Sequence, residues 1–154
     1  AVAVASNHDL PTVPAWWSSL DIELRDRLKL YPDANEAAYQ AKLRQRDQAQ
    51  LKRALEKEGL LTKSLNPQPD EWVPLVYAYL ARSNSFAALV QLADLTKEVD
   101  PVNLPGSTDQ YPNWRRKLSV AIEELLDNPS AKEVIEIFTE ERGAHRAVLE
   151  KSTH

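Results

Sequence analysis

The chain opens on a short apolar run that predicts a β-strand. Residues 1–5 read AVAVA, so an extended backbone would carry apolar side chains on both faces. Strands of this kind are typical of parallel sheets covered on both sides. Residues 7–17 (NHDLPTVPAWW) contain Asn, Asp and two prolines and predict a loop. A His-Asp pair therefore lies just past the end of a predicted buried strand.

Helical periodicity follows this loop. Leucines at every fourth position over residues 20–30 predict a short amphipathic helix, which the Tyr-Pro pair after it ends. Asp33 and Glu36 have the spacing of a capping box and predict the start of a longer helix that runs to Glu58 and stops at the next glycine. The polar middle of this helix, residues 44–48, is interpreted as solvated.

The second half of the chain mixes clear and ambiguous signals. Pro69 is placed to begin a helix, and the side chains available for burial on it are Trp72, Val76, Tyr79 and Leu80. Residues 86–92 are apolar and fit either a short buried strand or a buried helix. Residues 96–117 form a long loop with three prolines, and a loop of that length within a compact domain is more often functional than accidental.

Two more helices are predicted at the carboxyl end. One begins at Ser119, and the next carries a capping box formed by Ser130 and Glu133. The tail from Gly143 is predicted to be helical and weakly anchored. The order of elements therefore predicts a mostly α fold with one or two short parallel-type strands.

Composition narrows the function classes. A length of 154 residues fits one ordinary domain, and 43% hydrophobic residues allow a packed core. The formal net charge of −4 gives no overall electrostatic reason to bind nucleic acid or an anionic membrane. The absence of cysteine excludes disulfides and thiolate chemistry. His8, His145 and His154 are far apart in sequence, and no metal-ligand spacing is present.

Two further features suggest that the chain is a processed product or part of a longer one. It contains no methionine, and its opening strand has no partner at its own end of the sequence. We favour the second interpretation, because an apolar strand of this kind needs neighbours on both sides. An incomplete sheet would also leave an apolar face that favours self-association.

The residue types at positions 8 and 9 allow two interpretations. Aspartate is a preferred turn residue, so Asp9 could cap a turn with His8 packed beside it. Alternatively, the pair could serve chemistry, because residues at the carboxyl ends of barrel strands face the active site in α/β barrels. A carboxylate there can lie near a developing positive charge, and the neighbouring His can hydrogen-bond to hydroxyl groups.

Aromatic and basic side chains are candidates of a second kind. Trp114, Arg115 and Arg116 could indicate RNA binding, but the patch is short and the chain is acidic. We expect Trp114 to pin the loop to the core and the arginines to pair with nearby acids. Trp16 and Trp17 could stack on a sugar, although adjacent side chains on a loop rarely point the same way, so at least one should be core.

Four stretches in this order carry a specific resemblance: NHDLPTVPAWW, LKLYPD, YLARSNS to ALVQLADL, and VNLPGSTDQYPNWRRKL. Together they resemble the carboxyl-terminal part of bacterial 4-α-glucanotransferases (amylomaltases or disproportionating enzymes, glycoside hydrolase family 77). The resemblance extends to about residue 127 and fades in the tail. It implies a retaining transglycosylase on a (β/α)8 barrel that acts on maltooligosaccharides in the cytoplasm, without a metal or organic cofactor.

The resemblance also implies roles for individual residues. Members of this family use an Asp nucleophile, a Glu acid/base and a third carboxylate that binds and distorts the sugar. Asp9 matches the third carboxylate, His8 matches the sugar-binding His beside it, and Asn103 of the NLPG motif matches a position near the donor site. No segment here resembles the motifs of the nucleophile or the acid/base, and a whole barrel needs about 250 residues.

We therefore expect a segment of such an enzyme that is inactive alone. Residues 1–127 would form the carboxyl-terminal part of the barrel, with a helical insertion at about 33–82, and residues 128–154 a helical tail. The alternative is a non-catalytic helical module that binds glucans or a protein partner. Neither interpretation implies nucleic-acid or membrane binding.

Overall fold

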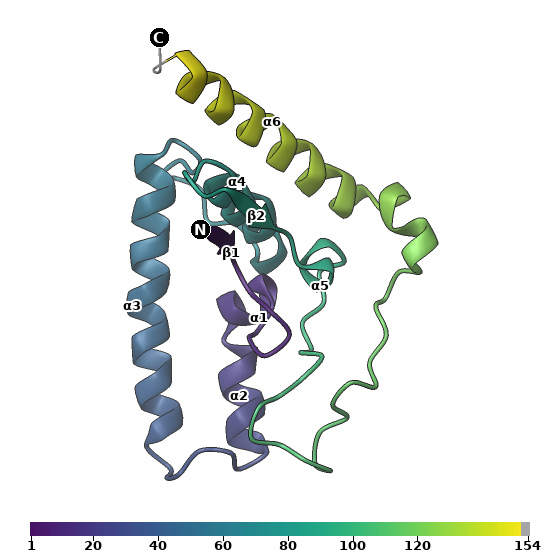
Figure 1. Cartoon of the computed structure of the whole chain (residues 1–154). Helices are drawn as coiled ribbons and strands as arrows, with labels where there is room; N and C mark the ends of the chain where they lie inside the picture. Colours follow the sequence, from purple (N-terminus) through teal and green to yellow (C-terminus); the bar gives the residue numbers. More distant parts are fainter. Residues whose placement is uncertain (152–154) are drawn as a thin grey trace.

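The computed structural model describes residues 1–151, with side chains described through residue 144. The chain is mostly helical with two short strands, as its sequence predicts (Figure 1). In chain order the elements are β1 (Val2–Val4), α1 (Val13–Ser18), α2 (Leu20–Arg27), α3 (Glu36–Lys57), the 3-10 helix η1 (Pro69–Glu71), α4 (Trp72–Ala81), β2 (Ala87–Leu89), α5 (Leu92–Leu95), the 3-10 helix η2 (Ile122–Asp127) and α6 (Pro129–Lys151). None of the helices in this part of the chain combines the length and apolar composition that a membrane crossing requires.

The two strands form a small parallel sheet. Val2 pairs with Ala87 and Val4 with Leu89, so the ambiguous run at 86–92 is a strand in its first half. The remainder of that run turns into α5. Val2, Val4 and Leu89 are all more exposed than buried side chains should be, since about half of each remains accessible. The sheet therefore exposes an apolar surface instead of burying both faces.

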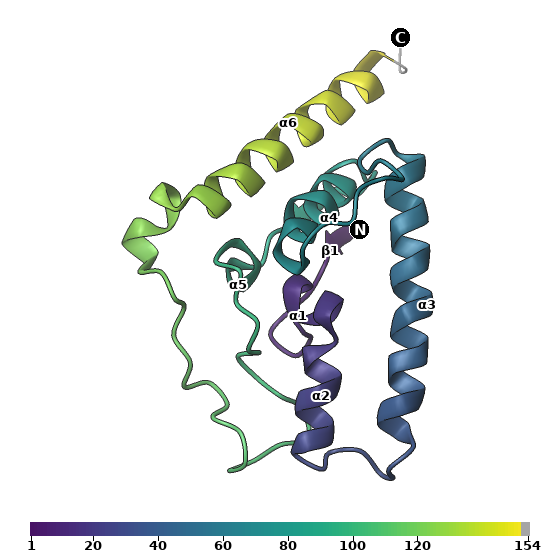
Figure 2. The same ribbon diagram turned by 180° about the vertical axis from the view of Figure 1, so that it is seen from behind.

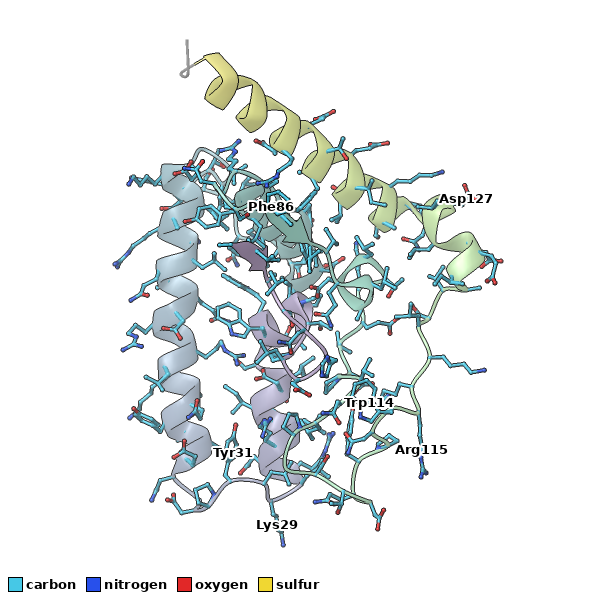
Figure 3. All side chains as sticks on the ribbon, viewed as in Figure 1. Lys29, Tyr31, Phe86, Trp114, Arg115 and Asp127 are labelled. Carbon is cyan, nitrogen blue, oxygen red and sulfur yellow. The ribbon has the colours of Figure 1, made fainter. Side chains whose placement is uncertain are left out.

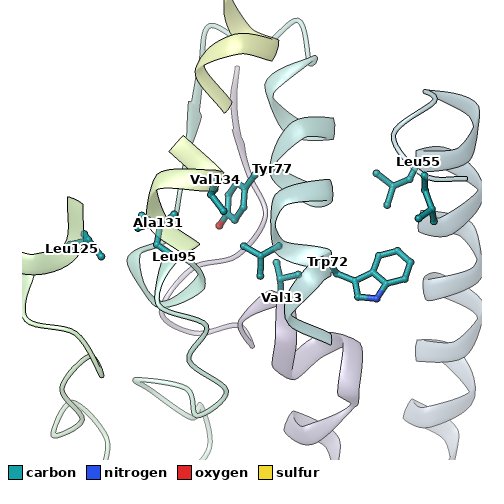
Figure 4. Close-up of a cluster of buried hydrophobic side chains, with 10 residues drawn as sticks. Val13, Leu55, Trp72, Tyr77, Leu95, Leu125, Ala131 and Val134 are labelled. Atoms are coloured by element: carbon teal, nitrogen blue, oxygen red, sulfur yellow. The ribbon is translucent and has the colours of Figure 1, made fainter. Parts of the chain in front are cut away.

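The helices lie around this sheet in two groups. Helices α1 and α2 lie beside the long α3, and α6 crosses over α4 at the opposite end of the molecule (Figures 1 and 2). The main core joins α1, α3, α4, α5, η2 and α6 (Figure 4). Its largest side chain is Trp72, which is fully buried and stacks on Trp17 with ring centroids 3.4 Å apart.

Two predicted assignments around this core are wrong. Part of the predicted loop at 7–17 is helical, because Thr12 caps α1 by accepting a hydrogen bond from the Ala15 N–H, and Pro14 fits its first turn. On α4 the buried tyrosine is Tyr77, whereas Tyr79 is 39% exposed. The predicted face misses Tyr77 because α6 covers a second side of this short helix.

The polar middle of α3 is solvated only in part: Gln45 and Arg46 are exposed as predicted, but Arg44 and Gln48 contact α1 and α2. Arg44 donates two hydrogen bonds of 2.8 Å to the Asp21 carboxylate and one of 2.6 Å to the Trp16 carbonyl. Its guanidinium also lies 4.8 Å from the centre of the Trp16 ring. Gln48 donates to the Trp17 carbonyl at 2.6 Å. This polar stretch is therefore the contact that fixes α3 against α1 and α2.

The predicted helix starts also differ in detail. Asp33 accepts from the Asn35 N–H and Glu36 from Gln40, so the capping box at Asp33 and Glu36 does not form. The helix predicted from Ser119 is the 3-10 helix η2. In place of the box at Ser130 and Glu133, α6 is capped by Asn128, whose side chain accepts from the Ala131 N–H at 3.1 Å. At the start of α3 no side chain caps the first turn.

Helix α6 is held on α4 by charged groups. Arg82 donates two hydrogen bonds of 2.7 Å to Glu141, and Arg142 donates to the Ser83 and Ser85 carbonyls. These hydrogen bonds from Arg82 hold the pKa of Glu141 below its ordinary value. The predicted helical tail from Gly143 continues to Lys151, and the question of its anchoring lies outside the described side chains.

A buried carboxylate joins three helices at the centre of the fold. Asp94 on α5 is 1% exposed and accepts from the Val13 N–H at 2.7 Å and the Tyr77 hydroxyl at 2.6 Å. Burial raises the pKa of Asp94. Burial and the adjacent carboxylate also raise the pKa of Tyr77, so the phenol keeps its proton and donates it.

We predict that Tyr77→Phe lowers the free energy of unfolding by about 1–3 kcal/mol, because it leaves a buried carboxylate oxygen of Asp94 without its donor. Chemical denaturation of the purified protein measures the change. Tyr79→Phe, on the same helix but exposed, is the matched control and should shift stability by less than about 0.5 kcal/mol. Equal effects of the two variants would contradict the assigned role.

A second prediction concerns the contact between α4 and α6. Because the pKa of Glu141 is lowered in the folded protein, its stabilisation is present at neutral pH and lost as the pH falls through that lowered value. The difference in melting temperature between the unaltered protein and Glu141→Gln should therefore be largest near neutral pH and vanish in acid. The exposed Glu140→Gln provides the control, and a difference that persists after Glu141 is protonated would count against this account.

Candidate functional site

The loop after β1 is a turn organised by Asn7. The Asn7 side chain accepts from the Asp9 N–H at 2.9 Å, and the Asn7 carbonyl accepts from the Leu10 N–H at 3.1 Å. Ser6 closes the loop by donating to the Pro11 carbonyl at 2.6 Å. The turn is therefore capped by Asn7 and not by Asp9, the residue that the sequence offered for this role. The Asp9 carboxylate is left available for other partners.

Asp9, His8 and Asn103 lie together, although Asn103 is distant in sequence. The Asn103 side-chain amide donates to Asp9 Oδ1 at 2.7 Å, and His8 Nε2 lies 3.4 Å from Asp9 Oδ2. The Asp9 side chain is 50% exposed. Each carboxylate oxygen therefore has one protein neighbour and remains accessible to hydroxyl groups from solvent or a ligand.

Two contacts lock the segments that carry these residues. Thr12 donates from its hydroxyl to the Glu98 carbonyl at 2.5 Å, and Asp94 accepts from the Val13 N–H. Glu98 itself accepts from the Ser119 N–H and the Thr96 hydroxyl, and these bonds outweigh burial and lower its pKa. The position of Asp9 relative to the loop after β2 is therefore set by buried or half-buried polar contacts.

The long predicted loop is ordered by Asn113. Its side-chain oxygen accepts from the Leu104 N–H at 2.8 Å, and its amide donates to Ser107 Oγ at 2.9 Å. These bonds hold the Asn103–Ser107 stretch in one conformation, and Asn103 immediately precedes the clamped Leu104 N–H. Irregular backbone of this kind keeps its shape only when side chains satisfy its polar groups.

Tyr111, and not Trp114, pins this loop to the body of the protein. Tyr111 is buried in a second core cluster with Leu24 and Leu104, and its hydroxyl donates to the Pro101 carbonyl at 2.6 Å. Burial raises the pKa of Tyr111, so it remains a donor. Arg116 pairs with Asp100 at 2.8 Å, which agrees with the structural role expected for it.

Trp114 is placed differently from its prediction. It is 63% exposed (Figure 3), and its ring lies beside the His8 imidazole with centroids 5.2 Å apart. Its backbone has φ of 61°, an unusual value for a bulky residue. Sequence reasoning missed this placement, and the only local signal was the Pro-Asn pair before it, which favours a turn.

The other tryptophan pair serves packing first. Trp17 stacks on Trp72, and the Arg44 guanidinium lies over the Trp16 ring. Both tryptophans therefore pack against other helices. Their edges line an apolar hollow of about 410 Å³ beside the loop after β1. The other lining residues are Ala5, Ser6, Leu10, Pro11, Val13, Leu51, Val76 and Leu80. This hollow lies on the core side of that loop.

The site occupies a characteristic place in the fold. Strands β1 and β2 are parallel; the loop that carries Asp9 follows the carboxyl end of β1, and the loop that carries Asn103 follows β2 after the short helix α5. Ligands of parallel α/β sheets bind at this edge. Within residues 1–144, no group of three or more His, Asp or Glu side chains is arranged to hold a metal ion. The available chemistry is a hydrogen-bonded carboxylate, an imidazole, an amide and an exposed indole.

Comparison of the chain with known proteins shows which family it belongs to. The model of glycoside hydrolase family 77, described as 4-alpha-glucanotransferase, matches residues 1–123. The chain belongs to this family. The 4-alpha-glucanotransferase of Mycobacterium tuberculosis is 31% identical over 141 residues, and that of Haemophilus influenzae is 29% identical over 140 residues.

Solved structures agree with the sequence comparison. The crystal structure of amylomaltase from Corynebacterium glutamicum is similar with a TM-score of 0.77 at 26% identity, and the match covers 90% of this chain. It covers only 21% of that amylomaltase chain, and the matches above cover 18% and 20% of the two transferases. The chain therefore spans about a fifth of the length of these family members.

The hydrogen bonds by which Asn113 holds the long loop lead to a third prediction. Asn113→Ala removes the acceptor of the Leu104 N–H, so this amide should exchange with solvent about tenfold faster in hydrogen-exchange measurements. The control is Asn66→Ala, in the exposed loop ahead of η1, which should leave Leu104 unchanged. Unaltered exchange at Leu104 in Asn113→Ala would mean that Asn113 does not hold the loop.

Proposed function

We propose that this chain is the part of a 4-α-glucanotransferase that supplies a sugar-binding carboxylate to a retaining active site. In this proposal Asp9 is the third carboxylate, and His8 and Asn103 are sugar contacts. The observation that carries it is the Asn103–Asp9 hydrogen bond of 2.7 Å, which joins two motifs that are far apart in sequence. Membership of the family supports the proposed reaction, and this contact supports the proposed position of the sugar site.

The chemistry of glycosyl transfer suits a carboxylate in this position. The transition state of a retaining transfer resembles an oxocarbenium ion, and hydrogen bonds to sugar hydroxyls strengthen as that charge develops. Asp9 is half exposed and can accept such bonds. Asn103 and His8 hold its two oxygens in one orientation, so little reorganisation is needed when the sugar binds.

The nucleophile and the acid/base belong to other strands of the complete enzyme in this proposal. Retaining enzymes need these two carboxyl groups about 5–5.5 Å apart. The nucleophile attacks the anomeric carbon while the acid protonates the departing oxygen. The 4-hydroxyl of an acceptor sugar then gives its proton to the deprotonated acid/base and displaces the nucleophile, so that an α-1,4-glucan chain is transferred between maltodextrins. Asp9 takes no proton and forms no bond to carbon in either step.

The fold proposed for the whole enzyme is a (β/α)8 barrel, in which β1 and β2 are neighbouring strands near its carboxyl-terminal end. Two features support this. The strands are parallel. Their apolar side chains are exposed in this chain, which fits strands whose faces are covered by further parts of a barrel. Residues 1–127 would belong to the barrel, with a helical insertion at about 33–82, and residues 128–154 would form a C-terminal helical tail.

A direct test replaces Asp9 in the complete enzyme. Asp9→Asn preserves the shape of the side chain but removes its charge, and we expect transfer from maltotriose to fall about 10²–10³-fold. Asp127→Asn, an exposed acid on η2 remote from the loop after β1, should keep full activity (Figure 3). Product chains separated by chromatography give the rate.

Three outcomes would count against parts of this proposal. Unchanged transfer by Asp9→Asn would refute the assigned role of this carboxylate. Transfer by the 154-residue chain alone would refute the assignment of the nucleophile and acid/base to other strands. Tight binding of maltotriose to this chain, with no transferase activity in the complete protein, would support a glucan-binding module instead.

A further inference from the structure

Trp114 occupies a backbone conformation that its residue type disfavours. It is the third residue of a turn closed by the Arg115 N–H, which donates to the Pro112 carbonyl at 3.2 Å. A positive φ at this position of a turn normally selects Gly or Asn, because a bulky side chain is strained there. Such strain costs about 1–3 kcal/mol and persists only where surrounding contacts enforce it.

A hydrogen bond enforces this conformation. The Trp114 N–H donates to the Val102 carbonyl at 2.9 Å, which ties the turn to the residue just before Asn103. The indole consequently points away from the core, and 63% of the residue is exposed. A large apolar side chain held out in water by strained backbone gains little from packing, so its benefit to the protein must come from a ligand or partner.

The surroundings of the indole indicate what that ligand is. His8 is next to both Trp114 and Asp9: the ring centroids of His8 and Trp114 are 5.2 Å apart, and His8 Nε2 lies 3.4 Å from Asp9 Oδ2. The imidazole therefore contacts both an exposed indole, with the two rings tilted by 46°, and a carboxylate that can accept hydroxyl hydrogens. A pyranose presents this same pair of surfaces, since its C–H face is apolar and its rim carries hydroxyl groups.

We propose that Trp114 is a sugar-stacking residue of the Asp9 site, on which a glucose unit of an α-1,4-glucan packs its C–H face. This inference rests on the proposed function and adds a binding residue to it. The indole would supply contact area at low cost in conformational entropy, because Trp has only two side-chain torsions. The strained turn fixes its direction before the sugar arrives, and His8 supports one edge of the ring.

The strain makes the proposal testable by a substitution that separates stability from binding. Trp114→Gly relieves the positive-φ cost, so the melting temperature of the complete enzyme should stay unchanged or rise. Loss of the stacking surface should raise the KM for maltotriose about tenfold, with kcat less affected. Trp114→Phe keeps an aromatic face and should retain a KM within about threefold of the unaltered enzyme.

A double variant separates stacking from an indirect effect through the imidazole. In a His8→Ala background, Trp114→Gly should still raise KM by the same factor, because the indole touches the sugar itself. If the effect disappears in that background, Trp114 acts by positioning His8 and the proposal is wrong. An unchanged KM in Trp114→Gly alone, or a melting temperature that falls because the indole packs against another part of the enzyme, would also overturn it.

The same experiment distinguishes this inference from the proposed function. Asp9→Asn is measured in parallel on maltotriose. If Asp9→Asn abolishes transfer while Trp114→Gly leaves KM unchanged, only the stacking role fails. If Asp9→Asn transfers normally, the assignment of the site itself fails, whatever the result at Trp114.

Discussion

The buried carboxylate of Asp94 is the interaction on which the rest of the arrangement depends. It draws the start of α1 and the hydroxyl of Tyr77 to one point, so three helices meet around a group that water cannot reach. A buried charge is tolerated only when its hydrogen bonds are satisfied, and both oxygens of this one have a donor. Because Val13 follows the Asp9 loop closely, the same bond sets where Asp9 lies.

The candidate site therefore combines a rigid support with exposed functional groups. The loops that carry Asp9 and Asn103 are irregular, yet Asn7 and Asn113 satisfy their backbone groups with side-chain hydrogen bonds. Exposed groups held by such loops can meet a ligand without first rearranging, which lowers the cost of binding. The turn at Trp114 is a second case in which the backbone fixes an exposed group. Its positive φ is strained, and it directs the indole outward.

Local pattern predicted much of this molecule, and particular residues show where it stopped. The leucine repeat over 20–30 and the glycine after Glu58 gave two helices close to their observed bounds, because these signals act within a few residues. Arg44 was misread as solvated, since its partners Asp21 and Trp16 come from another helix. The buried face of α4 was likewise misassigned, because α6 covers a side that periodicity could not reveal.

The sequence by itself determined the family, the mostly helical character and the chemical identity of His8, Asp9 and Asn103 as candidate groups. Motifs and hydrophobic spacing are properties of neighbouring residues, so they can be read from one chain. Only the tertiary structure decided that Asn103 reaches Asp9 and that Trp114 faces outward beside His8. Those facts depend on parallel pairing of two distant strands and on hydrogen bonds between loops, and neither leaves a periodic trace in the sequence.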